Sequence, residues 1–428
     1  MYHGGQSMSP AATGGRGGTA RKVAPWILAC GFLLCSSVLF LGESIQPTNH
    51  RPPVLQFLLL LFDSLSSIVD EHTRLPLPHT VIRKYVRSSA RSHPGESSQR
   101  AEGAIGVNYG MIANNLPTPD KVIAMYKANK ISYVRLFHPD TTVLTALRGT
   151  GIGVVLGTLN EDLAHLASDE SFAASWVASY VKPFAGAVTF RYITAGNEVI
   201  PGDLGTHVLP AIRNIETALK AAGVTGVPVT TAVATSVLGV SYPPSQAAFS
   251  EASAPVMAPL VAYLSSKKAP LLVNVYPYFA YAAEPETVQL GYALLAGSSA
   301  TSKIKVSSVT DGGLVYTNMF DAILDAAHAA VEKAGAQGLE LVVSETGWPS
   351  GGGGTGATVE NAAAYNNNVI RHAASGAGTP RRPGKAVETY LFAMFNENQK
   401  PEGTEQHFGL FQPDMSAVYP VDFAAGSY

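Results

Sequence analysis

The chain has 428 residues, of which 46% are hydrophobic and only 14% are charged. This balance provides the apolar side chains of a large core and excludes a protein that is disordered throughout. The net charge of −2 shows no basic excess, which argues against a nucleic-acid-binding protein. Cys30 and Cys35 are the only cysteines, so the chain beyond them holds no disulfide framework, Cys-ligated zinc site or thiol nucleophile.

The N-terminal region predicts a targeting segment. Three basic residues (Arg16, Arg21 and Lys22) come shortly before an uncharged apolar run at residues 24–42. This pattern is typical of a secretory signal, and we expect a cleaved signal peptide, with a retained signal-anchor as the alternative. We therefore divide the chain into a basic lead with its signal at residues 1–42, a linker of low order at 43–102, and a folded domain at 103–428.

Charge separates the leader from the folded domain. Residues 1–102 contain 10 Lys and Arg against 6 Asp and Glu, whereas residues 103–428 contain 19 against 25. The domain is therefore mildly acidic, and no nucleic-acid partner is expected. We expect a membrane contact only through residues 24–42, and only where that run is not cleaved.

Short apolar segments alternate with longer helical ones throughout the domain. The sequence Thr118-Pro119-Asp120 is typical of a helix start, and residues 319–335 have apolar side chains at helical spacing and end on a glycine. This alternation predicts an α/β fold, a (β/α)8 barrel in a single domain. A doubly wound open sheet is the alternative, but the first strand is not followed by GxGxxG. Strands are expected at residues 104–109, 131–138, 152–158, 188–196, 228–234, 271–278, 339–345 and 386–396.

Two carboxylates lie where predicted strands end. Glu198 follows the fourth strand and Glu345 ends the seventh. In a (β/α)8 barrel the C-terminal strand ends build the active site, so these two side chains should face each other there. Glycoside hydrolysis needs such a pair, one as acid and one as nucleophile or base, and Asn197 is placed to bind a sugar hydroxyl. For either residue alone, an ordinary surface carboxylate is an equally good interpretation.

Further polar and aromatic side chains gather near the same strand ends. Glu397, Lys400 and Glu405 follow the eighth strand and are expected to support the carboxylate pair, with a solvated loop as the alternative for the last two. Aromatic side chains offer broad apolar faces for sugar rings, although core packing explains each one singly. The candidate substrate-binding residues are Tyr109, Arg135, Phe137, Asn274, Tyr276, Tyr278, Phe279 and Trp348.

No metal or cofactor site is expected from the sequence. The histidines of the domain are scattered, with no HxH or HxxxH spacing. The glycine run at residues 351–354 is not followed by Gly-Lys-Ser/Thr, and Ser344 is not part of a G-x-S-x-G motif. We predict no cofactor and no metal.

Five motifs in order resemble the plant-type endo-β-1,3-glucanases of glycoside hydrolase family 17. The resemblance extends from about Ala104 to Phe423. It rests on AIGVNYGMIANNLPTP near the start, AGNEV at 195–199, NVYPYFAY at 274–281, VVSETGWPSGG at 342–352 and ETYLFAMFNENQKPEGTEQHFGLFQPD at 388–414.

The resemblance implies a retaining endo-hydrolase of β-1,3-glucosidic linkages in β-glucan. Glu198 then corresponds to the acid/base and Glu345 to the nucleophile, while Glu397, Lys400 and Glu405 fall on a charged cluster of the family. One departure is Phe137-His138, where many members carry a tyrosine followed by another residue. The implied protein is a secreted monomer of the extracellular space or cell wall, with the vacuole or membrane anchoring as alternatives.

Three alternatives stay open at this point. A mixed-linkage β-1,3;1,4-glucanase and a glucanosyltransferase would use the same residues. A non-catalytic glucan-binding protein would use the same barrel, although the presence of both Glu198 and Glu345 argues against it.

Overall fold

The structure, a computed structural model, describes residues 105–298 and 308–426. The predicted signal (1–42) and linker (43–102) lie outside the described residues, and both stay predictions. Within the described ranges, no helix combines the length and the apolar character needed to cross a membrane.

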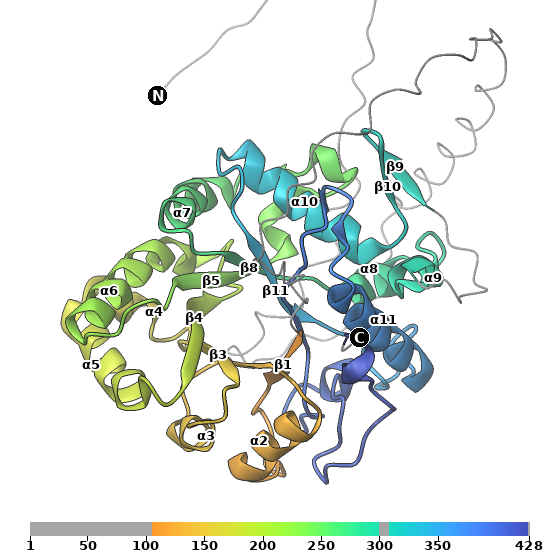
Figure 1. Cartoon of the computed structure of the whole chain (residues 1–428). Helices are drawn as coiled ribbons and strands as arrows, with labels where there is room; N and C mark the ends of the chain where they lie inside the picture. The colour runs from red at the N-terminus through yellow and green to blue at the C-terminus, as the bar shows by residue number, and fades with distance from the viewer. Residues whose placement is uncertain (1–104, 299–307, 427–428) are drawn as a thin grey trace, which may run out of the picture. The chain divides into compact units, whose positions relative to one another are not determined.

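Eight parallel strands form a closed barrel, which confirms the predicted (β/α)8 fold (Figure 1). Around the barrel the strands follow the order β1-β14-β11-β8-β5-β4-β3-β2. They are β1 (Ile105–Tyr109), β2 (Tyr133–Leu136), β3 (Gly153–Gly157), β4 (Thr189–Asn197), β5 (Val229–Ala234), β8 (Leu271–Asn274), β11 (Leu341–Thr346) and β14 (Thr389–Leu391).

Helices surround the barrel and cover its outer face (Figure 1). Several begin at a side chain that accepts hydrogen bonds from the first turn, as Asp140, Asp169, Asn318 and Thr358 do. Thr118 precedes a helix as predicted but makes no side-chain cap. The helices are α2 (Pro119–Ala128), α3 (Thr141–Ala146), α4 (Leu163–Ser168), α5 (Glu170–Tyr180), α6 (Val208–Ala221), α7 (Ala254–Lys267), α8 (Pro277–Ala283), α9 (Leu290–Ala293), α10 (Met319–Lys333) and α11 (Val359–Ala374).

The barrel strands are buried because the helices cover one face and the barrel interior the other. Every residue of β3 and of β11 is buried, which explains the continuous apolar sequence of β3 and of the first half of β11. The main core lies between the strands and the helices. A smaller cluster, formed by Val155, Ala232, Leu272, Val342 and Tyr390, is separate from it.

The eight predicted strands match the eight barrel strands, with differences at their ends. The sixth ends at Asn274 rather than at residue 278, because α8 begins at Pro277. The last is only three residues long, Thr389–Leu391. Three short hairpins between the main elements were not predicted: β6 (Leu238–Val240) with β7 (Ala248–Phe249), β9 (Val309–Asp311) with β10 (Leu314–Tyr316), and β12 (Gly378–Thr379) with β13 (Arg382–Pro383).

Candidate active site

The two predicted carboxylates lie at the same end of the barrel. Glu198 directly follows β4 and is partly exposed, whereas Glu345 lies within β11 and is only 6% exposed. Asn274, the last residue of β8, stands between them. The ends of three strands therefore bring two carboxylates and one amide together.

The side-chain nitrogen of Asn274 donates to both carboxylates. Its Nδ2 lies 2.8 Å from Glu198 Oε1 and 2.9 Å from Glu345 Oε1. These two oxygens are therefore no more than about 5.7 Å apart, the sum of the two bond lengths. Retaining glycosidases separate their carboxyl groups by ~5–5.5 Å and inverting ones by ~6.5–9.5 Å, so the geometry fits double displacement.

Ser344 fixes the orientation of this amide. Its hydroxyl donates to Asn274 Oδ1 over 2.7 Å, so the oxygen of the amide faces away from the two carboxylates. Ser344 is itself fully buried on β11, beside Glu345. A supporting role for Ser344 was not predicted from the sequence, although the neighbouring Glu345 was a signal for it.

Glu345 accepts hydrogen bonds from two donors besides Asn274. Arg135 Nη1 donates to Oε1 over 2.7 Å, and the Tyr276 hydroxyl donates to Oε2 over 2.8 Å. Burial raises the pKa of Glu345; the positive charge of Arg135 opposes that rise, and the negative charge of Glu198 adds to it. Burial also raises the pKa of Tyr276 well above its ordinary value, so its phenol stays a donor. All three donors stabilise the ionised form of Glu345.

Arg135 donates hydrogen bonds to Asn197 at the end of β4 and to Glu345 on β11. It is 1% exposed, and its Nη2 donates to Asn197 Oδ1 over 2.8 Å, while its guanidinium lies 4.6 Å from the centre of the Phe137 ring. The amide oxygen of Asn197 also accepts from Asn274 over 3.3 Å. Arg135 therefore orients Asn197 and Glu345 together.

The predicted charged group is assembled around Lys400. Its Nζ lies 3.7 Å from Glu397 and 3.8 Å from Glu405, and 4.2 Å from the centre of the Phe392 ring. Glu397 also accepts the Ile112 backbone N–H over 2.8 Å, so it holds the loop after β1 beside the segment that follows β14. Lys400 acts on the nucleophile candidate at longer range, since its charge opposes the rise in the pKa of Glu345.

Aromatic rings form a cluster beside the carboxylates. Phe392 lies 6.1 Å from Phe137 and 6.3 Å from Tyr276, and Phe408 lies 6.0 Å from Tyr276, as measured between ring centres. Phe279 joins this cluster at 5.3 Å from Tyr276. Phe392 and Phe408 were not predicted, because their motif was interpreted as strand and loop rather than as part of the site.

Three of the predicted sugar-binding aromatics are buried in this structure. Trp348 is fully buried, and its indole N–H donates to the Gly356 carbonyl over 2.8 Å. Tyr109 and Tyr278 are 2% and 3% exposed. Tyr109 packs against Phe395 and Tyr278 against Trp348, so core packing explains these rings in this structure. Their binding of a sugar stays a prediction.

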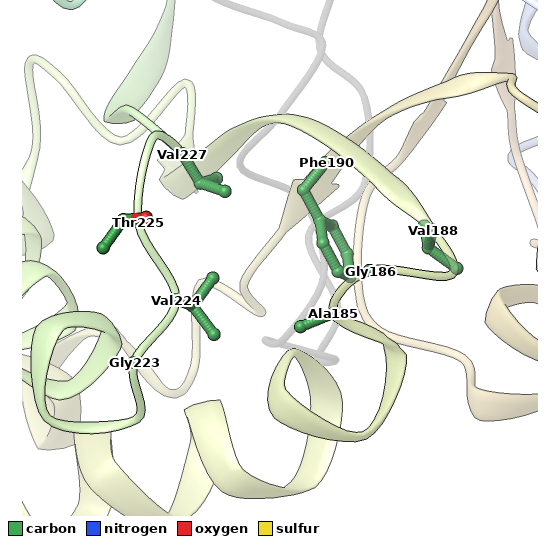
Figure 2. A pocket seen from close by; sticks show the side chains of 8 residues that line it. All are labelled: Ala185, Gly186, Val188, Phe190, Gly223, Val224, Thr225 and Val227. Carbon is green, nitrogen blue, oxygen red and sulfur yellow. The ribbon is translucent and has the colours of Figure 1, made fainter.

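A separate hollow of about 300 Å³ lies at the opposite end of the strands (Figure 2). It is formed by the turn before β4 and the loop before β5. Its lining contains no charged side chain, so it offers no group for acid–base chemistry. The residues are Ala185, Gly186, Val188, Phe190, Gly223, Val224, Thr225 and Val227.

Comparison with known proteins agrees with this geometry. The model of the family "Glycosyl hydrolases family 17" matches residues 105–423. The chain belongs to glycosyl hydrolases family 17. As a member of family 17 it is an O-glycosyl hydrolase.

Several family 17 relatives align with nearly their whole length. A putative glucan endo-1,3-beta-glucosidase GVI of Hordeum vulgare is 70% identical over 76% of this chain and 98% of its own. Lichenase-2 of Hordeum vulgare is 47% identical over 75% of this chain and 98% of its own.

Solved structures of family 17 share the fold. One comes from work on two plant beta-glucan endohydrolases with distinct substrate specificities; it is 46% identical, covers 74% of this chain and 100% of its own, and has a TM-score of 0.70. Another is CJP38, a beta-1,3-glucanase and allergen of Cryptomeria japonica pollen, at 43% identity, 75% and 99% coverage and a TM-score of 0.71.

Proposed function

We propose that this chain is a retaining endo-hydrolase of β-1,3-glucosidic linkages in β-glucans. The observation that carries the mechanism is the single Asn274 nitrogen bonded to both Glu198 and Glu345. The substrate class is supported by the 70% identical relative, which is named a putative glucan endo-1,3-beta-glucosidase.

The reaction proceeds in two displacements. Glu345 attacks the anomeric carbon and forms a glycosyl ester, while Glu198 gives its proton to the leaving glycosidic oxygen. Glu198, now ionised, then takes a proton from water, and the resulting hydroxide displaces Glu345 from the anomeric carbon. The second displacement restores both carboxyl groups to their starting protonation states.

The surrounding groups orient Glu345 and Asn197. Arg135 and Tyr276 hold Glu345 in its ionised form and in one orientation. Arg135 also engages the oxygen of Asn197, which directs the amide N–H groups of Asn197 to donate elsewhere. A sugar hydroxyl at the reacting ring is the acceptor we assign to them, since such a bond strengthens in the transition state.

The mechanism is tested with Glu345→Gln. This substitution keeps the size of the side chain but removes the nucleophile, so turnover of a soluble β-1,3-glucan should fall by at least ~10⁴-fold while binding of the glucan persists. Glu360→Gln is the matched control, because Glu360 is exposed at the start of α11 and should keep full activity. Near-normal turnover by Glu345→Gln would refute the assignment.

The stereochemistry of the product tests retention in the unmodified enzyme. NMR of the first hydrolysis products should show the β-anomer, and an initial α-anomer would refute double displacement. Products longer than the substrate would instead identify transfer of the glycosyl unit to a sugar hydroxyl, which separates a hydrolase from a transferase.

A mixed-linkage β-1,3;1,4-glucanase is the second candidate, because Lichenase-2 is 47% identical to this chain. The higher identity to the β-1,3-glucosidase relative favours the β-1,3-glucan. We expect kcat/KM to be at least ~10-fold higher on a linear β-1,3-glucan than on a mixed-linkage glucan assayed side by side. The reverse preference would move the chain to the second candidate.

A further inference from the structure

The backbone around Glu198 departs from regular strand geometry. Glu198 has a φ of +56°, in the left-handed region that residues with a Cβ seldom adopt. Just before it, the register between β4 and β5 shifts between Thr194 and Asn197. Such a conformation persists only where surrounding contacts hold it, so the direction of the Glu198 side chain depends on what fixes residues 196–197.

Side chains of the loop after β3 provide those contacts. The Thr158 hydroxyl accepts the Gly196 backbone N–H over 3.1 Å. Asn160 then bonds both backbone groups of Asn197: its Oδ1 accepts the N–H over 2.8 Å, and its Nδ2 donates to the carbonyl over 3.0 Å. The amide of Asn160 thus takes the place of a strand neighbour beyond the end of β3.

The neighbouring strand holds the same segment from its other side. The Glu198 backbone N–H donates to the Ala232 carbonyl over 2.9 Å, and the Thr231 hydroxyl donates to the Gly196 carbonyl over 3.3 Å. Asn160 is the contact in this set that fixes the N–H and the carbonyl of Asn197 together. The peptide link from Asn197 leads directly into Glu198, so a shift of Asn197 redirects the carboxyl group.

We propose that Asn160 is a positioning residue for Glu198, the acid/base of the proposed function on which this inference rests. Loss of Asn160 should impair one step, the protonation of the leaving group, because Glu198 must lie within hydrogen-bond distance of the glycosidic oxygen to protonate it. A leaving group that departs without a proton does not need this alignment. The orientation of Glu345 for its attack depends on Arg135 and Tyr276 instead.

The test measures kcat/KM of Asn160→Ala on two substrates. One is a linear β-1,3-glucan, and the other is a dinitrophenyl β-glycoside of a short β-1,3-gluco-oligosaccharide, whose phenolate leaves unprotonated. We expect kcat/KM to fall about 10- to 100-fold on the glucan and less than about threefold on the aryl glycoside. Because kcat/KM reports only the steps through the first displacement, the later role of Glu198 as a base does not interfere.

Two controls keep a structural effect apart from a positioning effect. Asn214→Ala also removes a half-buried asparagine, whose Nδ2 donates to the Leu166 and Ala167 carbonyls on α4. It should lower the melting temperature without changing the ratio of the two kcat/KM values. Asn160→Asp keeps the acceptor for the Asn197 N–H and should show the same selective loss, which covers the case that Asn160→Ala does not fold.

Glu198→Gln is the reference for the selective loss. If Glu198→Gln is selective and the Asn160 variants lose activity equally on both substrates, the positioning role is refuted while the proposed function stands. If Glu198→Gln itself loses activity equally on both substrates, the assignment of Glu198 as the acid is wrong, and the positioning role is refuted with it.

Discussion

The burial of Glu345 works against the ionised form of its carboxyl group. Burial raises the pKa of this carboxyl above its ordinary value of 4.5, and the charge of Glu198 raises it further. Arg135, the hydrogen bond from Tyr276 and the charge of Lys400 act in the opposite direction. The net direction is upward, so the carboxylate needs its donors to stay ionised near neutral pH.

This balance predicts the acidic side of the pH–rate profile. Protonated Glu345 cannot attack, so kcat/KM should fall as the pH drops through its pKa, with a midpoint above pH 4.5. Lys400→Met removes a positive charge that lowers the pKa of Glu345, so it should move the midpoint to higher pH. The profiles of the wild type and of Lys400→Met are measured on the dinitrophenyl glycoside, whose phenolate leaves without a proton from Glu198.

A matched lysine substitution tests whether the shift of the midpoint in Lys400→Met comes from charge at the site. Lys220 is exposed at the end of α6, and Lys220→Met should leave the midpoint where it is. A midpoint that stays in place or moves to lower pH in Lys400→Met would contradict the electrostatic explanation.

The sequence predicted the placement of the two carboxylates better than that of the residues that orient them. Glu198 and Glu345 were found because both follow apolar strands whose ends meet in a barrel. Asn274 was predicted only as a sugar ligand, because its contact with both carboxylates depends on the hydroxyl of Ser344 behind it. The burial of Trp348 was not predicted, because the sequence alone does not tell an exposed ring from a buried one.

At the level of elements, hydrophobic pattern was sufficient for the strands that the helices bury. β3 and β11 are buried along their whole length, and the apolar residues of β3 and of the first half of β11 are easily recognised. β14 is different: only three of the eleven residues predicted as strand pair with β1 and β11. Beyond Leu391 the chain is still apolar but pairs through isolated contacts such as Phe395 with Phe411.

The elements that pattern did not predict are short and stabilised by specific contacts. The β12–β13 hairpin has two residues in each strand, too few for a period of two to be visible. It is held from outside, because Asp325 on α10 accepts the Thr379 hydroxyl over 2.5 Å and the Arg381 backbone N–H over 2.8 Å. Such tertiary contacts are not readable from local sequence.

Over the whole molecule, the barrel has an arginine–glutamate pair at each end. Near the C-terminal strand ends, Arg135 and Glu345 are 2.7 Å apart with side chains 1% and 8% exposed. At the other end Arg191 pairs with Glu388, with side chains 33% and 14% exposed. In barrels of this type the active site lies at the C-terminal end of the strands, whereas residues at the N-terminal end contribute to stability. Loss of the Arg135–Glu345 pair should therefore affect catalysis, and loss of the Arg191–Glu388 pair should affect stability.

Three tyrosines contact the Arg191–Glu388 pair at the N-terminal end. Glu388 accepts the Tyr390 hydroxyl over 2.7 Å and the Tyr192 hydroxyl over 3.1 Å. The Arg191 guanidinium lies 4.7 Å from the centre of the Tyr133 ring. These residues come from β2, β4 and the start of β14, so the cluster links strands on different sides of the barrel.

Glu388→Gln should therefore reduce stability and leave catalysis intact. The substitution keeps the shape of the side chain but removes its charge and weakens three hydrogen bonds, so the free energy of unfolding should fall by about 1–3 kcal/mol in denaturant titrations. The kcat on β-1,3-glucan should stay within about twofold of wild type, because no group of this cluster contacts Glu198 or Glu345.

Glu216→Gln is the control: it breaks the more exposed pair with Lys267, 3.0 Å long, and should lower the free energy of unfolding by less than about 1 kcal/mol. An equal loss of stability in both variants would show that the cluster adds nothing beyond a surface ion pair, and a large loss of kcat in Glu388→Gln would show that the two ends of the barrel are coupled.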